Sequence, residues 1–521
     1  MRSIPTFLLT VGLAVAAHFA APSPAFAEER SIEGVLTVVW GDPHGAHAAG
    51  HTRYGLALAD GRRIGLDITD TDRAAAVTHF GKRVRVVGTT SAAESTDATG
   101  AERLAVQRIE GLDPVAETAD APAATTTKRV LFILLKFKND TQTPHAPAFF
   151  KELTNPLTPK TALGLPATIN GFFAKTSWNR LQWKADVAGV GGLNPTNWFT
   201  LPRTKTQYAP CGWSGGCADI DRLGDDAMAL AKAAGVNLAV YDAVSFVTNN
   251  DLDCCAWGGG YHYAALGKSY GATWEPPWGQ EPAVYVHEFG HSIGLPHSGW
   301  VYEAYDSPWD EMSDGSTASS LNCGSYRSAN SSNSTRTLTC KEPGGGYITP
   351  HKKHLGWLPS ANEVVIDRVS TRAITLDAGA RPLGTTKKMI RVCIAGHPCT
   401  GPAAHYLAVE ARRKLAQFDE GLPGEGVIIH DVRMNRGPIG STNPCFFNDQ
   451  SGWAVPMDAT PGDWRGAPTC DAGGRSFPNY ALNNAQFTPG KKLDRRSTWG
   501  VMVEVVRATT TGYVVKVTRT R

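Results

Sequence analysis

The sequence contains no cysteine before Cys211 and no segment in which lysine and arginine predominate. The formal net charge is only +3 over 521 residues, so the chain lacks the basic surface that nucleic-acid binding requires. None of the cysteines forms a C-x-x-C pair, which argues against zinc-ribbon and thioredoxin-like sites. What remains is a globular composition, with 42% hydrophobic and 19% charged residues, in a chain long enough for two or three domains.

The first residues are typical of a secretory signal peptide. Arg2 precedes an apolar run from Phe7 to Ala21, and Ala25–Ala27 has the small-x-small pattern of a cleavage site. The run is shorter than the roughly 20 residues of a membrane span, and no later segment suits one. The sequence therefore predicts a secreted or periplasmic protein that begins near Glu28 and keeps no membrane anchor. An uncleaved N-terminal anchor is the alternative.

Cysteine usage agrees with export. The ten cysteines form an even number, which in an exported protein predicts disulfide bonds. Local bridges are expected for Cys393–Cys399, Cys323–Cys340 and Cys445–Cys470, although spacing does not fix the connectivity. The adjacent pair Cys254-Cys255 is expected to bond to two different partners, because a bridge between neighbours is strained.

Composition divides the chain into regions. Residues 28–112 contain about five short β-type segments between Gly- and Asp-rich turns, which predicts a small barrel or sandwich similar to an oligonucleotide/oligosaccharide-binding barrel. Residues 113–128, rich in Ala, Thr and Pro, predict an exposed linker. Residues 129–360 alternate strands and helices, which predicts a mixed sheet, and residues 361–521 are β-rich. The expected fold class is multidomain α+β.

Individual elements can also be placed. A helix capped by Asp219 or Asp221 should end at Gly235, and a short helix from Thr349 to Gly356 should carry His351 and His354 on its surface. The expected strands are Gly34–Trp40, Tyr54–Ala59, Arg63–Ile68, Lys82–Gly88, Val130–Lys138, Val244–Thr248, Val364–Ile366, Ala373–Leu376, Tyr406–Glu410, Gly426–Val432 and Trp499–Thr518.

Residues 286–297, VHEFGHSIGLPH, contain the residues best suited to chemistry. On a helix, His287 and His291 are i and i+4, so both imidazoles project from one face. Gly294 can adopt a positive φ, which would let His297 turn back as a third ligand. Three imidazoles leave one zinc position for water, whose pKa the ion lowers towards about 7. Glu288 is placed to act as the general base.

This segment resembles the signature of the metzincin metallopeptidases, H-E-x-x-H-x-x-G-x-x-H, at every fixed position. The resemblance implies a methionine beneath the metal, and Met312 in residues 308–314, PWDEMSD, would supply this soft apolar floor. The chain is most similar to gametolysin-like peptidases, through HEFGHSIGLPHSG, PWDEMS and the later segments 406–410 (YLAVE) and 424–432 (GEGVIIHDV). Asp314 stands where astacin- and serralysin-type members carry tyrosine, so no tyrosine ligand is expected.

The resemblance implies a zinc endopeptidase that hydrolyses extracellular polypeptides. Its substrate would bind extended along an edge strand, for which Trp257–Leu266 is the expected segment. Residues 28–128 would then be a pro-domain of a zymogen, removed by cleavage in the linker, although a permanent accessory domain is the alternative. A cysteine switch is excluded because no cysteine precedes Cys211.

Other functions and sites remain open at this point. The module could be inactive in a secreted adhesion or binding protein, or it could be a zinc amidase that acts on a cell-wall peptide. The acidic groups Asp219/Asp221 and Asp251/Asp253 could bind structural calcium through their oxygens, although helix capping explains the first group. Nothing in the sequence indicates the oligomeric state.

Overall fold

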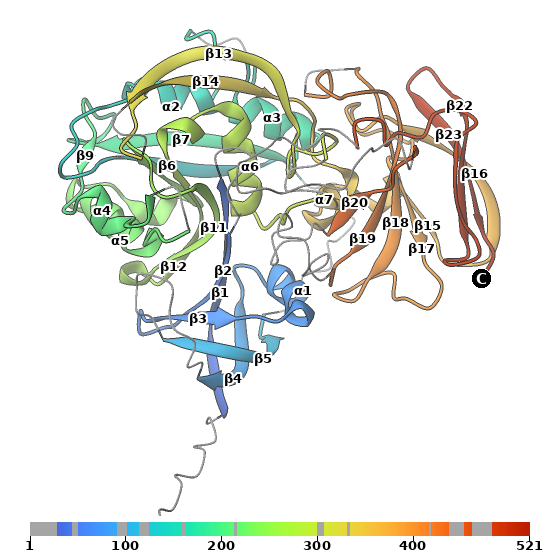
Figure 1. The fold of residues 1–521 in the computed structure, drawn as a ribbon, viewed down its shortest axis with the longest axis horizontal. Helices are drawn as coiled ribbons and strands as arrows, with labels where there is room; N and C mark the ends of the chain where they lie inside the picture. Colours follow the sequence, from blue (N-terminus) through green and yellow to red (C-terminus); the bar gives the residue numbers. More distant parts are fainter. Residues whose placement is uncertain are drawn as a thin grey trace, which may run out of the picture.

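The computed structural model shows a multidomain, strand-rich α/β protein whose parts follow the order of the chain (Figure 1). It describes residues 29–43, 51–90, 102–113, 124–158, 162–212, 216–299, 307–330, 334–415, 418–436, 453–460 and 482–521. The expected signal peptide and the expected Cys445–Cys470 bridge lie outside these ranges. Among the described helices, none is long and apolar enough to cross a membrane.

The N-terminal part is a small barrel. Its elements are β1 (Glu29–Pro43), β2 (His51–Ala57), β3 (Arg63–Asp67), α1 (Asp70–Thr78), β4 (Arg83–Thr90) and β5 (Arg103–Gly111). The strands pair in the order β2-β3-β5-β4-β1, and β1 also pairs with β2, so the ring closes. Leu36, Leu56, Ile64 and Val86 are among the side chains that fill it. The four strands placed by range are present and β5 completes the expected number of about five, whereas α1 was not expected.

The central part is built on a sheet that continues from the barrel. Its strands are β6 (Thr126–Lys136), β7 (Leu181–Gly189), β8 (Gly192–Leu193), β9 (Phe199–Thr200), β10 (Ala243–Thr248), β11 (Cys255–Tyr263) and β12 (Lys268–Glu275). β12, β10, β6 and β7 run parallel, and β11 pairs antiparallel with β12. β6 begins at Thr126, so the last three residues of the expected linker are part of a strand.

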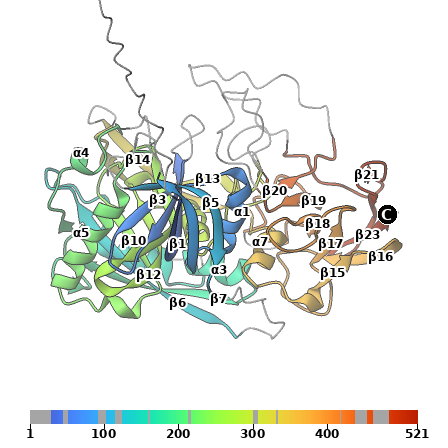
Figure 2. The ribbon, with the colours of Figure 1, turned by 90° about the horizontal axis from the view of Figure 1, so that it is seen from below.

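Helices cover both faces of this sheet (Figure 2). α5 (Ile220–Ala233) packs on one face, where Leu223, Ala227 and Ala231 enter the core. As expected, Asp219 caps this helix, because its side chain accepts from the Arg222 N–H. α2 (Pro147–Thr154), α3 (Ile169–Thr176) and α6 (Pro282–Ser292) share the core on the opposite face. The hairpin β13 (Ser316–Arg327) and β14 (Thr335–Pro343) and the helices α4 (Lys205–Tyr208) and α7 (Thr349–His354) complete this part.

The C-terminal part consists of two sheets that enclose one core. In the first sheet the strand order is β15 (Glu363–Ile366), β17 (Met389–Cys393), β18 (His405–Arg412), β19 (Gly426–Arg433) and β20 (Ala454–Pro456). In the second sheet the strand order is β16 (Ser370–Asp377), β23 (Gly512–Arg519), β22 (Val501–Ala508) and β21 (Lys492–Arg495). Buried side chains from both sheets, such as Val409 and Val515, pack together. The expected β-rich composition is therefore present.

The disulfides confirm part of the expected pairing. Cys323–Cys340 and Cys393–Cys399 are bonded as expected, and Cys211 bonds to Cys217. The expectation for Cys254-Cys255 was wrong, because these two neighbours are bonded to each other. Every other cysteine within the described ranges already has a partner of its own, so none is left for either of them.

Candidate metal centre

α6 carries the two histidines of the motif as the sequence predicts. The helix begins at Pro282 and ends at Ser292, and Gly294 follows with a φ of 97°. Val286 and Phe289 are fully buried against the sheet, where the Phe289 ring lies 4.8 Å from that of Trp183. The positive φ of Gly294 turns the chain back sharply, since residues with a Cβ rarely adopt it. His297 is thereby brought towards the two helical histidines.

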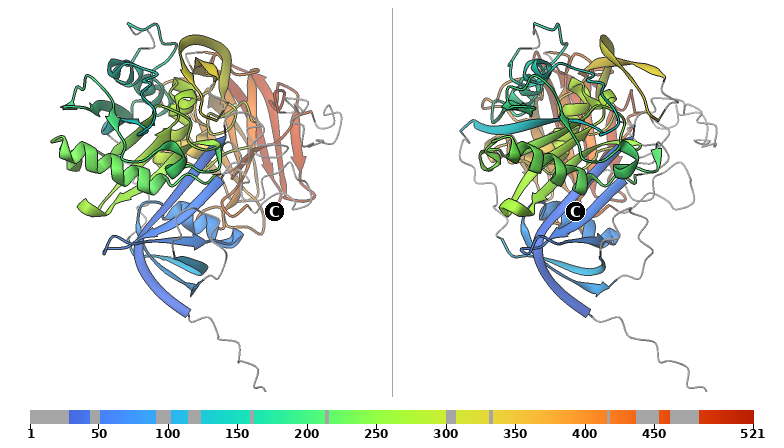
Figure 3. Two further views of the ribbon diagram at one scale, coloured as in Figure 1. Left: turned by 60° about the vertical axis from the view of Figure 1, so that its left-hand side comes forward. Right: turned by 90° about the vertical axis from the view of Figure 1, so that its left-hand side faces the viewer.

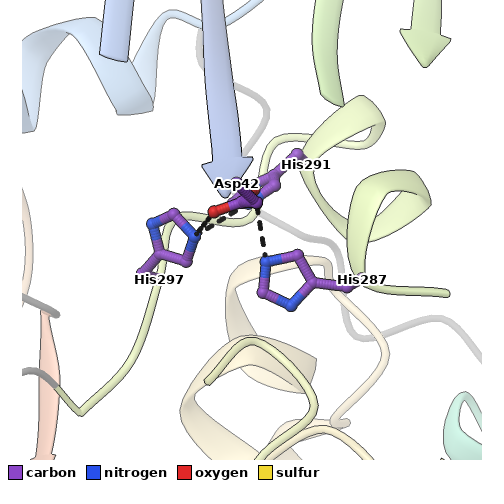
Figure 4. Close-up of side chains that lie close together, drawn as sticks. All are labelled: Asp42, His287, His291 and His297. Carbon is purple, nitrogen blue, oxygen red and sulfur yellow. Dashed lines mark hydrogen bonds and ion pairs between the residues drawn. The ribbon is translucent and has the colours of Figure 1, made fainter. Parts of the chain in front are cut away.

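Four side chains converge here, namely Asp42, His287, His291 and His297, and we call them the histidine–aspartate group (Figure 4). The Nε2 atoms of His291 and His297 are 3.2 Å apart. Asp42 Oδ1 lies 2.8 Å from His297 Nε2, and Asp42 Oδ2 lies 3.2 Å from His291 Nε2 and 3.5 Å from His287 Nε2. All four side chains are buried, and their ligand atoms lie within 4.8 Å of one another. The group could hold a metal ion.

Hydrogen bonds orient two of the imidazoles. His287 Nδ1 donates to the carbonyl oxygen of Glu311 (2.6 Å), and His291 Nδ1 donates to that of Leu295 (2.7 Å). A carbonyl oxygen only accepts, so in the neutral ring the Nε2 lone pair points to the centre of the group. Burial and the neighbouring His297 lower the pKa of His291 to about 3, which keeps this ring neutral.

The donor set fits a metal ion. The His291 Nε2 lone pair and a carboxylate oxygen of Asp42 face each other at 3.2 Å, and both are acceptors. Burial alone would raise the pKa of Asp42, but its interactions with His297 and His287 outweigh this effect and hold the pKa well below its usual value. Buried acceptors that face one another in this way need a cation between them. Imidazole and carboxylate are ligands that zinc accepts.

Glu288 lies beside this group and has no exposed surface. Its carboxylate rests against Gly258 of β11, where an added Cβ would stand 2.6 Å from Glu288 Oε2. Burial raises the pKa of Glu288 well above its usual value, and the nearby charges of Asp42 and Glu275 add to this effect. The residue expected to act as the general base is thus next to the histidines, in a pocket that disfavours its charged form.

Met312 is fully buried beneath α6, with its sulfur against Gly290, which lies between the two helical histidines. The turn that carries it is fixed to the rest of the site, because the Ser298 N–H donates to the Met312 carbonyl oxygen (3.0 Å). Asp310, two residues before Met312, accepts a hydrogen bond from Ser298 Oγ (2.6 Å). The structure therefore brings together all six residues named from the motif, and it adds Asp42.

The C-terminal part supports the loop of His297. The Trp453 N–H donates to the His297 carbonyl oxygen (3.3 Å), and the Gly299 N–H donates to that of Ala454 in β20 (3.0 Å). Sequence reasoning anticipated neither this support nor Asp42. Asp42 lies 255 residues from His297, and no spacing rule connects two such distant positions. Locally, Asp42 differs from other acidic residues only in lying just after the expected strand Gly34–Trp40.

The surface location expected for His351 was wrong. His351 is fully buried, and its Nδ1 lies 2.9 Å from Asp310 Oδ2. Trp453 Nε1 donates to the other ring nitrogen (2.6 Å). The short helix was predicted, but the β-rich C-terminal part packs over it and removes its exposed face. His351 instead helps to hold the methionine turn in place.

The pairing with His351 yields a prediction about stability. Burial alone would raise the pKa of Asp310, but His351 and the hydrogen bond from it lower the pKa to about 2. A carboxyl with a pKa lower in the folded state than in the unfolded state stabilises the fold above about pH 4. Asp310→Asn should therefore lower the free energy of unfolding by about 2 kcal/mol at pH 7. Urea denaturation measures this difference.

The same difference should fall to roughly half at pH 3, since the stabilisation is lost as the pH approaches the folded-state pKa. Asp314→Asn, at an exposed position of the same turn, is the control and should change little at either pH. If the free energies of unfolding of wild type and Asp310→Asn differed by the same amount at both pH values, the stabilising role of the ionised Asp310 carboxylate would be contradicted.

The carboxylates considered for calcium have protein partners. Asp219 caps α5, and Asp251 accepts from the hydroxyl of Tyr326 (2.7 Å) and from that of Ser328. Asp253 accepts from the Ala218 N–H (2.8 Å). Calcium binding remains a prediction that these contacts do not strengthen.

Comparison with known proteins adds no relationship. No family model matches the chain, and no curated protein is significantly similar to it. The resemblance to metzincins therefore depends on the motif residues and on the site that they form.

Proposed function

We propose that the protein is a secreted zinc-dependent endopeptidase that hydrolyses peptide bonds of extracellular proteins. The observation that carries this proposal is the convergence of His287, His291 and His297 beside Glu288, all buried on or next to one helix. The resemblance of the motif to the metzincins, in particular to gametolysin-like peptidases, gives the reaction class. The disulfides agree with an oxidising compartment outside the cytoplasm.

The residues have separate roles in this reaction. Zinc, when bound by the three histidines, would supply Lewis-acid polarisation of the scissile carbonyl and would acidify water. Glu288 accepts a proton from the attacking water and delivers it to the leaving amine. The raised pKa makes the Glu288 carboxylate a stronger proton acceptor than an exposed glutamate. Gly294 and Met312 position the ligands and do not touch the substrate.

Two other functions use the same site differently. In a binding or adhesion protein with an inactive module, Glu288 would have no role, although both it and the three histidines are in place. A zinc amidase would use the same four residues on a cell-wall peptide. Endopeptidase activity is favoured over the amidase because β11 beside the site already pairs antiparallel with an extended chain segment, the end of β1, as it would with an extended polypeptide substrate.

Metal removal tests the proposal. The protein should hydrolyse denatured casein or gelatin after limited proteolysis, and dialysis against 1,10-phenanthroline should abolish the activity. One equivalent of zinc should restore it, whereas calcium alone should not. Cleavage of isolated peptidoglycan but of no protein would favour the amidase, and unchanged hydrolysis without metal would contradict the proposal. The mass-spectrometric profile of cleaved peptides identifies the specificity.

A further inference from the structure

β1 belongs to two parts of the molecule at once. From Glu29 to Val35 it pairs with β4, and from Val35 to Gly41 it pairs with β2, so most of its length closes the barrel. Its last five residues, Val39 to Pro43, pair antiparallel with β11 of the central sheet. Figure 3 shows this strand leaving the barrel and entering the central part. One strand therefore joins the two parts into a single 12-stranded sheet.

The end of β1 occupies the place expected for a substrate. β11 covers most of the segment expected to bind an extended polypeptide, and its outer edge is paired with β1 from Cys255 to Gly259. All nine residues of β11 are buried. No unpaired edge of β11 is left opposite the histidine–aspartate group, so a polypeptide cannot pair there in this arrangement.

Alternate side chains of this segment point into the site. Trp40 is stacked on His291, with ring centroids 4.7 Å apart and 14° between the planes. Asp42, two residues further on, contacts all three histidines, as expected for side chains on one face of a strand. Gly41 faces the other way, and an added Cβ there would lie 2.6 Å from the Trp257 ring. The segment therefore fits the site closely on both faces.

Further contacts fix the barrel to the central part. Arg63 of β3 donates to both carboxylate oxygens of Asp225 in α5, each at 2.9 Å. Arg53 of β2 donates to the carbonyl oxygens of Ala218 and Gly216, and its guanidinium lies 4.2 Å from the Trp257 ring centroid. These contacts hold β1 in register with β11, so the position of Asp42 is set by the whole barrel.

We infer that the barrel, residues 29–113, is an inhibitory domain that keeps the enzyme latent. Asp42 is the fourth ligand of the metal held by the three histidines, and β1 occupies the edge strand in place of a polypeptide. The site opens when β1 leaves β11, and the Ala-, Thr- and Pro-rich segment between β5 and β6 is the place for the activating cleavage. This inference rests on the proposed function, since it requires the same metal.

The first test measures the metal and not the reaction. Cobalt(II), a spectroscopic substitute for zinc, is loaded into the intact wild-type chain and into the intact variants Asp42→Ala and Asp42→Asn. The control is Asp60→Ala, because Asp60 is an exposed carboxylate of the same barrel. Both Asp42 variants should alter the visible spectrum and release the metal to 1,10-phenanthroline about tenfold faster or more, whereas Asp60→Ala should match the wild type.

The second test measures access to the site. Intact Gly41→Val, whose side chain would collide with Trp257, should cleave a short quenched peptide about tenfold faster or more than intact wild type. Asp42→Asn, which preserves the shape of the segment, should also raise this rate. Limited proteolysis between β5 and β6 should activate the wild type and the Asp60→Ala control alike. N-terminal sequencing should place the new N-terminus between these two strands.

The outcomes separate the inference from the proposed function. Cobalt spectra and release rates that are identical in the Asp42 variants and the wild type would overturn the inference alone. So would an intact wild-type chain that is as active as the cleaved one, because the barrel would then be a permanent accessory domain. If no variant binds stoichiometric metal, the proposed function fails and the inference fails with it.

Discussion

Replacing Glu288 with alanine should lower kcat/KM of the cleaved enzyme by about 10² to 10⁴-fold, which is the usual contribution of a general base. The zinc content should not change, because the three histidines are intact and Glu288 is not needed to hold the ion. The loss should appear mainly in kcat, since the carboxylate acts on the proton in the transition state and not on substrate binding.

Two further variants make this result specific. Glu288→Gln keeps the volume of the buried side chain but removes the base, so it should lose as much activity as the alanine variant while remaining folded. Glu420→Ala, at an exposed position between β18 and β19, should keep full activity. Equal hydrolysis by wild type and Glu288→Gln would favour the binding or adhesion function.

His291→Ala should abolish both zinc binding and hydrolysis. His291 is fully buried at the centre of the group and is oriented by the Leu295 carbonyl. Loss of a residue that only orients a ligand lowers metal affinity by about 10 to 100-fold, so loss of a ligand itself should exceed this range. Zinc content after dialysis, measured by mass spectrometry, and titration with a zinc indicator report the change.

The control for this experiment is another buried histidine. His262 lies on β11, where its Nδ1 is 3.0 Å from Ser269 Oγ, and it is not part of the group. His262→Ala should keep one equivalent of zinc. Full zinc content in His291→Ala would exclude this residue as a ligand and, with it, the proposed three-histidine site.

Local patterns in the sequence were sufficient for the elements that bear the motif. Pro282 and Gly294 bracket α6 as helix start and stop residues do, and Asp219 caps α5. The i, i+4 spacing placed His287 and His291 on one face because helix geometry is local. Gly294 indicated the turn that returns His297. These features depend on interactions within a few residues, which a sequence displays directly.

Features that depend on distant parts of the chain were not accessible in this way. Nothing near Asp42 marks it as a neighbour of the histidines, because strand pairing between β1 and β11 is set by the docking of two folded parts. The burial of His351 has the same origin, since Trp453, far along the chain, packs against it. The bond between Cys254 and Cys255 is likewise not revealed by their spacing.

The pairing of β1 with β11 has a consequence for solubility. An uncovered edge strand exposes N–H and C=O groups that can pair with any extended chain, including that of a second molecule. An uncovered β11 would therefore be able to pair with a second molecule while the protein folds. The barrel covers this edge from within the same chain, so these groups of β11 are already paired and are not open to a second molecule.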